Sequence, residues 1–298
     1  MAIDGSWGTG GTDEESIATI HHAETLGINL LDTSASYGSG HSEEVIGRAL
    51  EGRRDRYIVA TKVKPVIDDP DEDNARQQIV EICEASLKRL QTDYIDVLQL
   101  HRDPHEQTMA AVMDALADLK SQGKIRWFGI SSNNTQVIGQ LQALGELAVV
   151  QVGYHLINRG GESTLAHAKA GNLGTLIRMP MASGALTGKH FNKEPSLSGD
   201  DLRKSRFSSE KGIAAFKRLS ELLFLTEGGR RTMVQAALRF VLDTDGVSAV
   251  IPGAINRKQL EENAGAVDVP ALTPEERSRA MLIAGEVSSF SSLGVIQG

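Results

Sequence analysis

The sequence has one cysteine, Cys83, among its 298 residues. A single thiol excludes an intramolecular disulfide and any zinc site built on several thiolates. The apolar residues Ile79, Ile82 and Leu87 lie around it at helical spacing. Because a free cysteine is usually a small buried apolar residue, we expect Cys83 to lie in the core on a helix.

Basic charge and long apolar runs are also scarce. The chain has 31 Lys and Arg residues against 39 Asp and Glu residues, which gives a formal net charge of −8. A protein that binds a phosphate backbone usually carries the opposite balance, so we expect no nucleic-acid partner. No apolar run approaches the roughly 20 residues of a membrane span, and residues 1–5 lack the basic and apolar stretches of a signal peptide. We therefore expect no membrane partner and a cytoplasmic location.

Short β-rich runs and longer helical segments alternate along the chain. The composition, 40% hydrophobic and 23% charged, is that of an ordinary globular protein. Thr12 and Glu15 have the spacing of a capping box, which predicts a helix from there to Gly27. The β-rich runs are 28–31, 57–60, 95–100, 125–130, 149–152, 175–177 and 247–251. This alternation predicts a parallel sheet covered by helices, and an open doubly wound sheet or a closed (β/α)8 barrel would both satisfy it.

The glycine clusters do not decide between these two architectures. Gly8, Gly10 and Gly11 precede a predicted helix, but no strand precedes them as a dinucleotide fingerprint requires. The cluster from Gly184 to Lys189 lacks the spacing of a P-loop, so a kinase or ATPase is not supported.

Each β-rich run ends in a polar or conformationally special residue. In a barrel the carboxyl ends of the strands meet on one face, where catalytic groups lie. We therefore expect these residues to surround a common site. They are Asp32, Thr61 with Lys62, His101, Ser131 with Ser132, Gln151, Arg178, and Pro252 with Gly253.

Four of the polar residues form a set suited to proton delivery. A phenol such as Tyr37, with an ordinary pKa of about 10, is a poor proton donor at neutral pH. A neighbouring cation, here Lys62, would stabilise the phenolate, and Asp32 would hold that cation in place. His101 would hydrogen-bond the oxygen of a bound carbonyl. Such a set suits a reaction in which another agent supplies hydride, without a metal ion.

Several segments of the chain, taken in order, resemble the aldo-keto reductase superfamily. The similar segments are 31–44, with Asp32 and Tyr37 five residues apart, 60–62, 86–101, 123–131 and 251–254 followed by Gln259, Glu262 and Asn263. The resemblance implies a single (β/α)8 barrel domain over residues 1–298 and reversible reduction of an aldehyde or ketone with a nicotinamide cofactor. It assigns Tyr37 as the acid, Lys62 and Asp32 as its tuning pair, and His101 as the residue that orients the substrate.

The resemblance also implies where the cofactor binds. The carboxamide would lie near Ser131, Ser132 and Gln151. The nicotinamide and pyrophosphate would lie along the stretch from Arg178 to Lys189, and the adenosine end near the turn that begins at Gly253. The residues expected along these two stretches are Arg178, Pro180, Ser183, Gly184, Lys189, Gly253, Arg257, Gln259, Glu262 and Asn263.

The chain departs from the family pattern at several positions. Ser132 stands where many members have Asn, and Arg178 stands where a stacking Tyr is common. Gly253 and Gln259 replace basic residues that often bind a 2′-phosphate, but Arg257 and Lys258 lie close by, so we expect NADP, with NAD as the alternative. The N-terminal hairpin and most of the first barrel strand are expected to be missing.

Two other functions remain open at this stage. The same fold serves in cofactor-sensing subunits of larger assemblies, and fold alone does not fix function. A Schiff-base aldolase would use Lys62 as its nucleophile.

The polar segment from His190 to Phe207 is expected to form a long loop, either a lid or a surface insertion. The substrate and the oligomeric state are not predicted.

Overall fold

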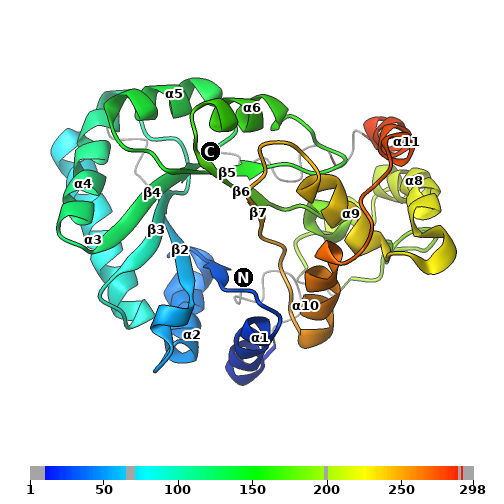
Figure 1. The fold of residues 1–298 in the computed structure, drawn as a ribbon, viewed down its shortest axis with the longest axis horizontal. Helices are drawn as coiled ribbons and strands as arrows, with labels where there is room; N and C mark the ends of the chain where they lie inside the picture. Colours follow the sequence, from blue (N-terminus) through cyan, green and yellow to red (C-terminus); the bar gives the residue numbers. More distant parts are fainter. Residues whose placement is uncertain (1–10, 65–70, 198–200, 288–289, 291–298) are drawn as a thin grey trace.

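A curled parallel sheet surrounded by helices forms the body of the protein (Figure 1). The computed structural model describes residues 11–64, 71–197, 201–287 and 290. The sheet has the order β1-β2-β3-β4-β5-β6-β7, with every neighbouring pair parallel. The strands are β1 (Leu30–Asp32), β2 (Ile58–Val63), β3 (Ile95–Leu100), β4 (Ile125–Ser131), β5 (Val149–Gly153), β6 (Gly174–Arg178) and β7 (Ala249–Val250). Each lies at one of the seven predicted runs.

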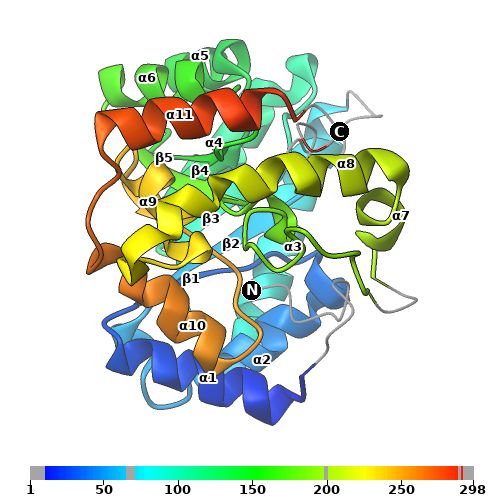
Figure 2. The same cartoon turned by 90° about the vertical axis from the view of Figure 1, so that its right-hand side faces the viewer.

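Helices follow the strands and cover the outer face of the sheet (Figures 1 and 2). The α-helices are α1 (Asp13–Thr25), α2 (His41–Ala49), α3 (Glu72–Leu90), α4 (Met109–Ser121), α5 (Thr135–Leu144), α6 (Glu162–Ala170), α7 (Lys204–Phe207), α8 (Glu210–Leu219), α9 (Met233–Leu242), α10 (Arg257–Ala264) and α11 (Pro274–Gly285). Short 3-10 segments are η1 (Tyr37–Gly40), η2 (Arg54–Arg56), η3 (Glu106–Thr108), η4 (Ala182–Gly184), η5 (Ser220–Gly229) and η6 (Gly265–Val267).

Capping boxes fix where three of these helices begin. The Thr12 hydroxyl accepts a hydrogen bond from the Glu15 amide at 3.2 Å, and the Glu15 carboxylate accepts one from the Thr12 amide at 3.0 Å. Each box satisfies backbone donors that have no partner within the helix. The predicted start of the first helix is therefore confirmed, and α9 and α11 begin with the same arrangement.

The inner face of the sheet has an apolar layer followed by a polar layer. Alternate residues of a strand point to the same face, so positions two apart share the interior. The apolar layer contains Leu30, Ala60, Val97, Val149, Leu176, Ala249 and Ile251, which pack together. Two residues further along their strands come Asp32, Lys62, Gln99, Gln151 and Arg178. The polar groups are therefore concentrated at the carboxyl ends of the strands.

Buried apolar side chains form the core between the sheet and the helices. Cys83 is completely buried in it, as predicted, and burial raises the pKa of its thiol to about 12. Gly129 of β4 lies so close to β5 that a Cβ there would be 2.2 Å from the Val149 carbonyl oxygen. Such an approach is possible only for glycine.

Strands β1 and β7 are the two edges of the sheet among the described residues. The helices span the opening between them, since α1 lies beside α10 (Figures 1 and 2) and His22 Nε2 is 2.8 Å from Glu261 Oε1. Residues 1–10, on which the predicted loss of a first strand depends, lie outside the described part of the chain.

The polar segment from His190 to Phe207 differs in part from the predicted loop. It includes the short helix α7, and both of its ends are buried. His190 and Phe207 pack with Phe216 and Phe290 in an aromatic cluster. Burial of these rings anchors the segment to the barrel at both ends. In the described ranges, no helix is long and apolar enough to cross a membrane.

Candidate active site

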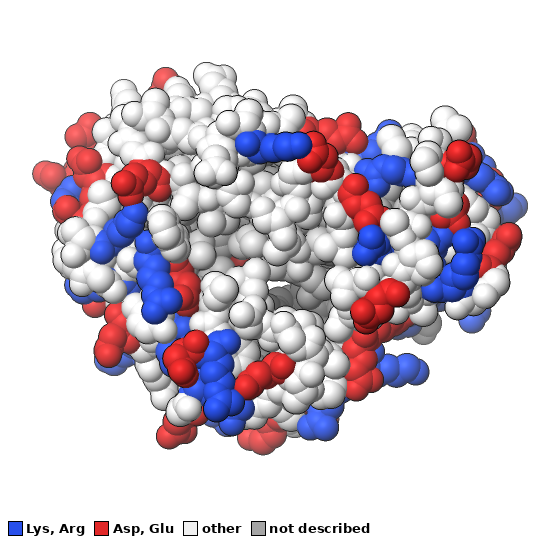
Figure 3. All heavy atoms as spheres, viewed as in Figure 1, with Lys and Arg blue, Asp and Glu red and all other residues white. Residues whose placement is uncertain are grey.

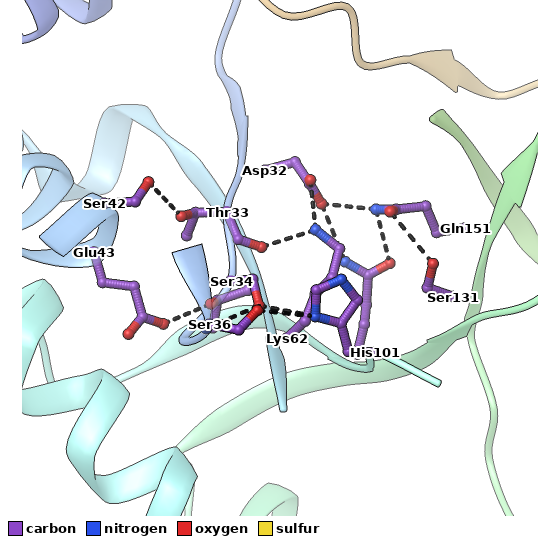
Figure 4. A network of polar contacts seen from close by, with 12 residues as sticks. Asp32, Thr33, Ser34, Ser36, Ser42, Glu43, Lys62, His101, Ser131 and Gln151 are labelled. Carbon is purple, nitrogen blue, oxygen red and sulfur yellow. Dashed lines mark hydrogen bonds and ion pairs between the residues drawn. The ribbon is translucent and has the colours of Figure 1, made fainter. Parts of the chain in front are cut away.

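The polar layer at the carboxyl ends of β1 to β6 contains three of the predicted catalytic residues, Asp32, Lys62 and His101 (Figure 4). Lys62 of β2 donates hydrogen bonds to Asp32 Oδ2 at 2.6 Å and to the Thr33 carbonyl oxygen at 2.8 Å. The Lys62 side chain is completely buried, and that of Asp32 is 11% exposed. A buried ammonium is tolerated only with such partners. The pair therefore places a fixed positive charge at the end of β2.

Two glutamine side chains bind the Asp32 carboxylate oxygen that Lys62 does not contact. Gln151 Nε2 donates to Asp32 Oδ1 at 2.7 Å, and Gln99 Nε2 donates to the same oxygen at 3.3 Å. Gln99 was missed in the sequence analysis, although it lies two residues before His101 within an otherwise apolar face of β3. Its place on the strand was the signal, because residues two apart face the same side.

Tyr37 begins η1, five residues after the end of β1, and its ring lies beside both Lys62 and His101. The Lys62 Nζ atom is 5.2 Å from the centre of the Tyr37 ring. The centres of the Tyr37 and His101 rings are 5.7 Å apart, in an edge-on arrangement. Tyr37 is partly exposed. The structure thus groups an acid, a phenol, an amine and an imidazole around one space.

A buried ion pair anchors the turn that carries Tyr37. Glu43, in the first turn of α2, is completely buried and lies 2.6 Å from Arg89 of α3. Its other oxygen accepts a hydrogen bond from the Thr61 hydroxyl at 2.6 Å. Because Thr61 precedes Lys62, the contact ties the start of α2 to the strand that carries the cation. Gly40 permits the close approach, since a Cβ there would be 2.6 Å from Arg89 Cδ.

His101 follows β3, and its imidazole is neutral around pH 7. Burial, followed by the charge of Lys62, lowers the pKa of His101 to about 4. Its Nδ1 atom lies 3.0 Å from the Ser34 hydroxyl and 3.4 Å from the Ser36 hydroxyl. A neutral imidazole can donate one hydrogen bond, which is the capacity needed to orient a carbonyl oxygen.

The residues predicted to bind the carboxamide lie at the ends of β4 and β5. Ser131 and Gln151 are paired in register, with their side-chain oxygens 3.5 Å apart. The Ser132 hydroxyl is turned to the backbone, where it accepts from the Asn134 amide at 3.0 Å. Asn133 makes two hydrogen bonds to the backbone of Gly153, at 2.8 and 2.9 Å. Here Asn133 therefore links β4 to β5.

Arg178 and the loop after β6 form a second predicted group. Burial lowers the pKa of Arg178 to about 10, and Tyr37 acts on it in the opposite direction. Met179, Ala182 and Ser183 have φ angles of 55°, 50° and 53°. This left-handed conformation is unfavourable for any residue other than glycine. Backbone strain of this kind is often found at functional sites, and this is the loop on which the pyrophosphate is predicted to bind.

The same loop presents groups that fit an anionic dinucleotide. The Ser183 hydroxyl oxygen is buried and has no hydrogen-bond partner among the described residues. Arg203, which sequence reasoning missed, donates from Nη1 to the Ser183 carbonyl oxygen at 3.1 Å and lies against Gly184. Pro180 is buried and Lys189 is exposed. The Arg203 guanidinium is already paired with the buried Asp201 carboxylate at 2.6 Å, so the Ser183 hydroxyl is the group of this loop that could meet a pyrophosphate.

The third predicted group forms its own cluster at the turn from β7 to α10. The buried Asn263 side chain donates from Nδ2 to the Gly253 carbonyl oxygen at 3.2 Å. Gln259 Oε1 accepts from the Ile255 amide at 3.2 Å, so this side chain is engaged in the turn. Arg257 is exposed in the first turn of α10, and Glu262 is partly exposed. A Cβ on Gly253 would meet open space, so this surface can be approached closely.

Charge is unevenly distributed over the face seen in Figure 3. Charged side chains lie mainly around the margin, over the helices, and the centre over the sheet is mostly uncharged.

Known proteins share both this sequence and this architecture. The family described as "Aldo/keto reductase family" matches residues 1–281. Aldo-keto reductase YhdN of Bacillus subtilis (strain 168) is 37% identical over 276 residues, which cover 87% of this chain and 81% of YhdN. The glycerol dehydrogenase AKR11B4 from Gluconobacter oxydans has a TM-score of 0.78 and 31% identity, over 96% of this chain and 90% of that one. An aldo/keto reductase from Klebsiella pneumoniae, solved with NADP and acetate, has a TM-score of 0.72 and 27% identity, over 91% and 86%.

These similarities decide between the two predicted architectures. The solved neighbours are (β/α)8 barrels, so the seven curled strands belong to that class and not to an open doubly wound sheet. The predicted barrel is confirmed. Because the family match extends over almost the whole described chain, it covers all three groups of predicted site residues. The chain belongs to the aldo/keto reductase family.

Proposed function

We propose that this protein is an NADP-dependent enzyme that reversibly reduces an aldehyde or ketone to an alcohol, with Tyr37 as the proton donor. Membership of the family supports NAD(P)H-dependent carbonyl reduction. The observation that supports the assignment of residues is the completely buried Lys62 side chain, paired with Asp32, beside the Tyr37 ring. A fixed cation next to a phenol stabilises the phenolate that remains after a proton is transferred.

Four residues of the chain have different roles in the reduction of the carbonyl group. His101, kept neutral by burial, donates a hydrogen bond to the carbonyl oxygen and orients it toward Tyr37. Tyr37 gives that oxygen its proton as negative charge develops there. Lys62 stabilises the resulting phenolate, and Asp32 with Gln99 and Gln151 keeps Lys62 in place. In alcohol oxidation, the Tyr37 phenolate takes the proton back.

The nicotinamide cofactor supplies hydride when it is bound. We assign its carboxamide to Ser131, Ser132 and Gln151, and its pyrophosphate to the loop with Pro180, Ser183, Gly184 and Lys189. The adenosine end would contact Gly253, Arg257, Gln259, Glu262 and Asn263, while Arg178 would lie along the nicotinamide. The buried Ser183 hydroxyl supports this assignment, because a buried polar group normally has a partner.

NADP is proposed in preference to NAD on two grounds. Arg257 and Lys258 are exposed in the first turn of α10, where their charge and the helix N-terminus favour a phosphate. The Klebsiella pneumoniae relative was solved with NADP. A cofactor-sensing subunit is not supported, since the relatives reported above are described as reductases or a dehydrogenase.

A binding measurement followed by an assay tests this proposal. NADPH and NADH are titrated separately by fluorescence, and the preferred cofactor is then tested with a panel of aldehydes and ketones. We expect saturable binding, tighter for NADPH, and cofactor oxidation with at least one carbonyl. Failure to bind either nicotinamide, or binding without turnover of any carbonyl in the panel, would contradict the proposal.

A further inference from the structure

A pair of serine hydroxyls lies behind His101, on the segment between β1 and Tyr37 (Figure 4). The Ser34 hydroxyl oxygen is 3.0 Å from His101 Nδ1, and Ser34 is completely buried. The Ser36 hydroxyl lies farther from the same nitrogen, at 3.4 Å, and Ser36 is exposed. Ser34 is therefore the closer and better shielded partner of the imidazole.

The hydrogen bonds around Ser34 restrict the direction of its proton. Its oxygen accepts from the Ser36 amide at 3.2 Å and lies 3.0 Å from the Ser36 hydroxyl oxygen. The proton of Ser34 can therefore be donated to His101 Nδ1 or to the Ser36 oxygen. An imidazole nitrogen is far more basic than an alcohol oxygen, and Ser36 has water as another partner. Donation to Nδ1 is the stronger bond.

We propose that Ser34 is a positioning residue, whose hydroxyl donates to His101 Nδ1 and so holds the ring proton on Nε2. The hydrogen bond at one ring nitrogen of a neutral histidine determines which nitrogen carries the proton. With Nδ1 occupied as an acceptor, Nε2 is the donor available to a carbonyl oxygen. This inference rests on the proposed function for its catalytic meaning, since His101 is assigned there as the residue that orients the substrate.

Ser34 also links His101 to the proton donor. Its carbonyl oxygen accepts a hydrogen bond from the Tyr37 amide at 3.0 Å. The neighbouring Thr33 carbonyl oxygen accepts from Lys62 Nζ, and the Ala35 amide donates to the Lys62 carbonyl oxygen at 3.3 Å. The backbone of this segment thus hydrogen-bonds to Tyr37 and Lys62, and the Ser34 side chain determines the tautomer of His101.

The test compares Ser34→Ala with Ser34→Thr, which keeps the hydroxyl, and with Ser36→Ala, which removes the more distant one. The ring nitrogens of His101 are observed by ¹⁵N NMR in the full chain without substrate, and kcat/KM is measured at pH 7. Wild type, Ser34→Thr and Ser36→Ala should carry the proton on Nε2. Ser34→Ala should show a mixture of tautomers and a roughly five- to tenfold lower kcat/KM, because one hydrogen bond is worth about 1 kcal/mol.

The two readouts separate this inference from the proposed function. Protonation of Nδ1 in the wild type, or an unchanged tautomer in Ser34→Ala, would overturn it. An equal effect of Ser34→Ala and Ser36→Ala on the ring nitrogens would overturn it too. If the protein turned over no carbonyl, the proposed function would fail, while the NMR spectrum would still show which ring nitrogen of His101 carries the proton.

Discussion

Lys62 Nζ lies 2.6 Å from Asp32 Oδ2 at the carboxyl ends of two neighbouring strands, with the lysine side chain entirely buried. Register pairs Asp32 with Ala60 and so brings Lys62, two residues further along β2, next to the end of β1. The charge of Lys62 is therefore positioned by strand pairing as well as by its hydrogen bonds.

The two members of this pair should shift the pKa of His101 in opposite directions. Lys62 lowers the pKa of His101, and Asp32 raises it. Lys62→Met should therefore raise this pKa above about 4, and Asp32→Asn should lower it further. NMR titration of the His101 ring protons measures both variants. A shift of the same sign in the two variants would show that their charges do not act on the imidazole as described.

Loss of charge at Glu43 should destabilise the protein. Glu43 is completely buried against Arg89, so Glu43→Gln leaves a guanidinium without its counter-charge, at a cost on the order of 3 kcal/mol. Urea unfolding measures the change. The matched control is Asp245→Asn, because Asp245 and Lys169 form an ion pair that is largely exposed, and its unfolding midpoint should stay unchanged. Equal midpoints for the two variants would contradict this account of the Tyr37 turn.

Two glycine substitutions should differ sharply in stability. Gly129→Ala would place a Cβ 2.2 Å from the Val149 carbonyl oxygen, so β4 and β5 must separate, at a cost of about 1–3 kcal/mol or more. Gly285→Ala, at the end of α11, would meet nothing within 4 Å and should not destabilise the protein. Thermal unfolding compares the two. A stable Gly129→Ala variant would mean that β4 and β5 can separate without cost.

Arg257 and Lys258 should govern the preference for NADPH. Replacing both with Met removes two positive charges at the start of α10 and should raise the Kd for NADPH while leaving that for NADH unchanged. Lys169→Met serves as the control, since it removes a charge from α6 without affecting α10. Fluorescence titration measures all the constants. An equal increase in the Kd values for NADPH and NADH would show that these residues do not act by binding the 2′-phosphate.

The strands, and the residues predicted to be catalytic that lie at their ends, could be predicted from the sequence because both depend on local patterns. Short apolar runs mark the strands, and the polar residues with which the runs end lie at the carboxyl ends of the strands, as Asp32 and Lys62 do. Gln99 was missed because it lies within the apolar run of β3 rather than at its end, although its spacing of two residues from His101 puts both on one face. Arg203 was missed for another reason. Its contact with Ser183 depends on how a loop folds back across 20 residues, and no sequence period encodes such a path.

Tyr37→Phe tests the central claim most directly, because it removes the phenolic hydroxyl and keeps the ring that lies beside Lys62 and His101. The measurement is the single-turnover rate of NADPH oxidation with an aldehyde that the wild type reduces, together with the Kd for NADPH. The account predicts a rate about 10²–10⁴-fold lower, since a positioned proton donor is lost, with an unchanged Kd. A variant that reduced the aldehyde at the wild-type rate would contradict the role of Tyr37 as the proton donor.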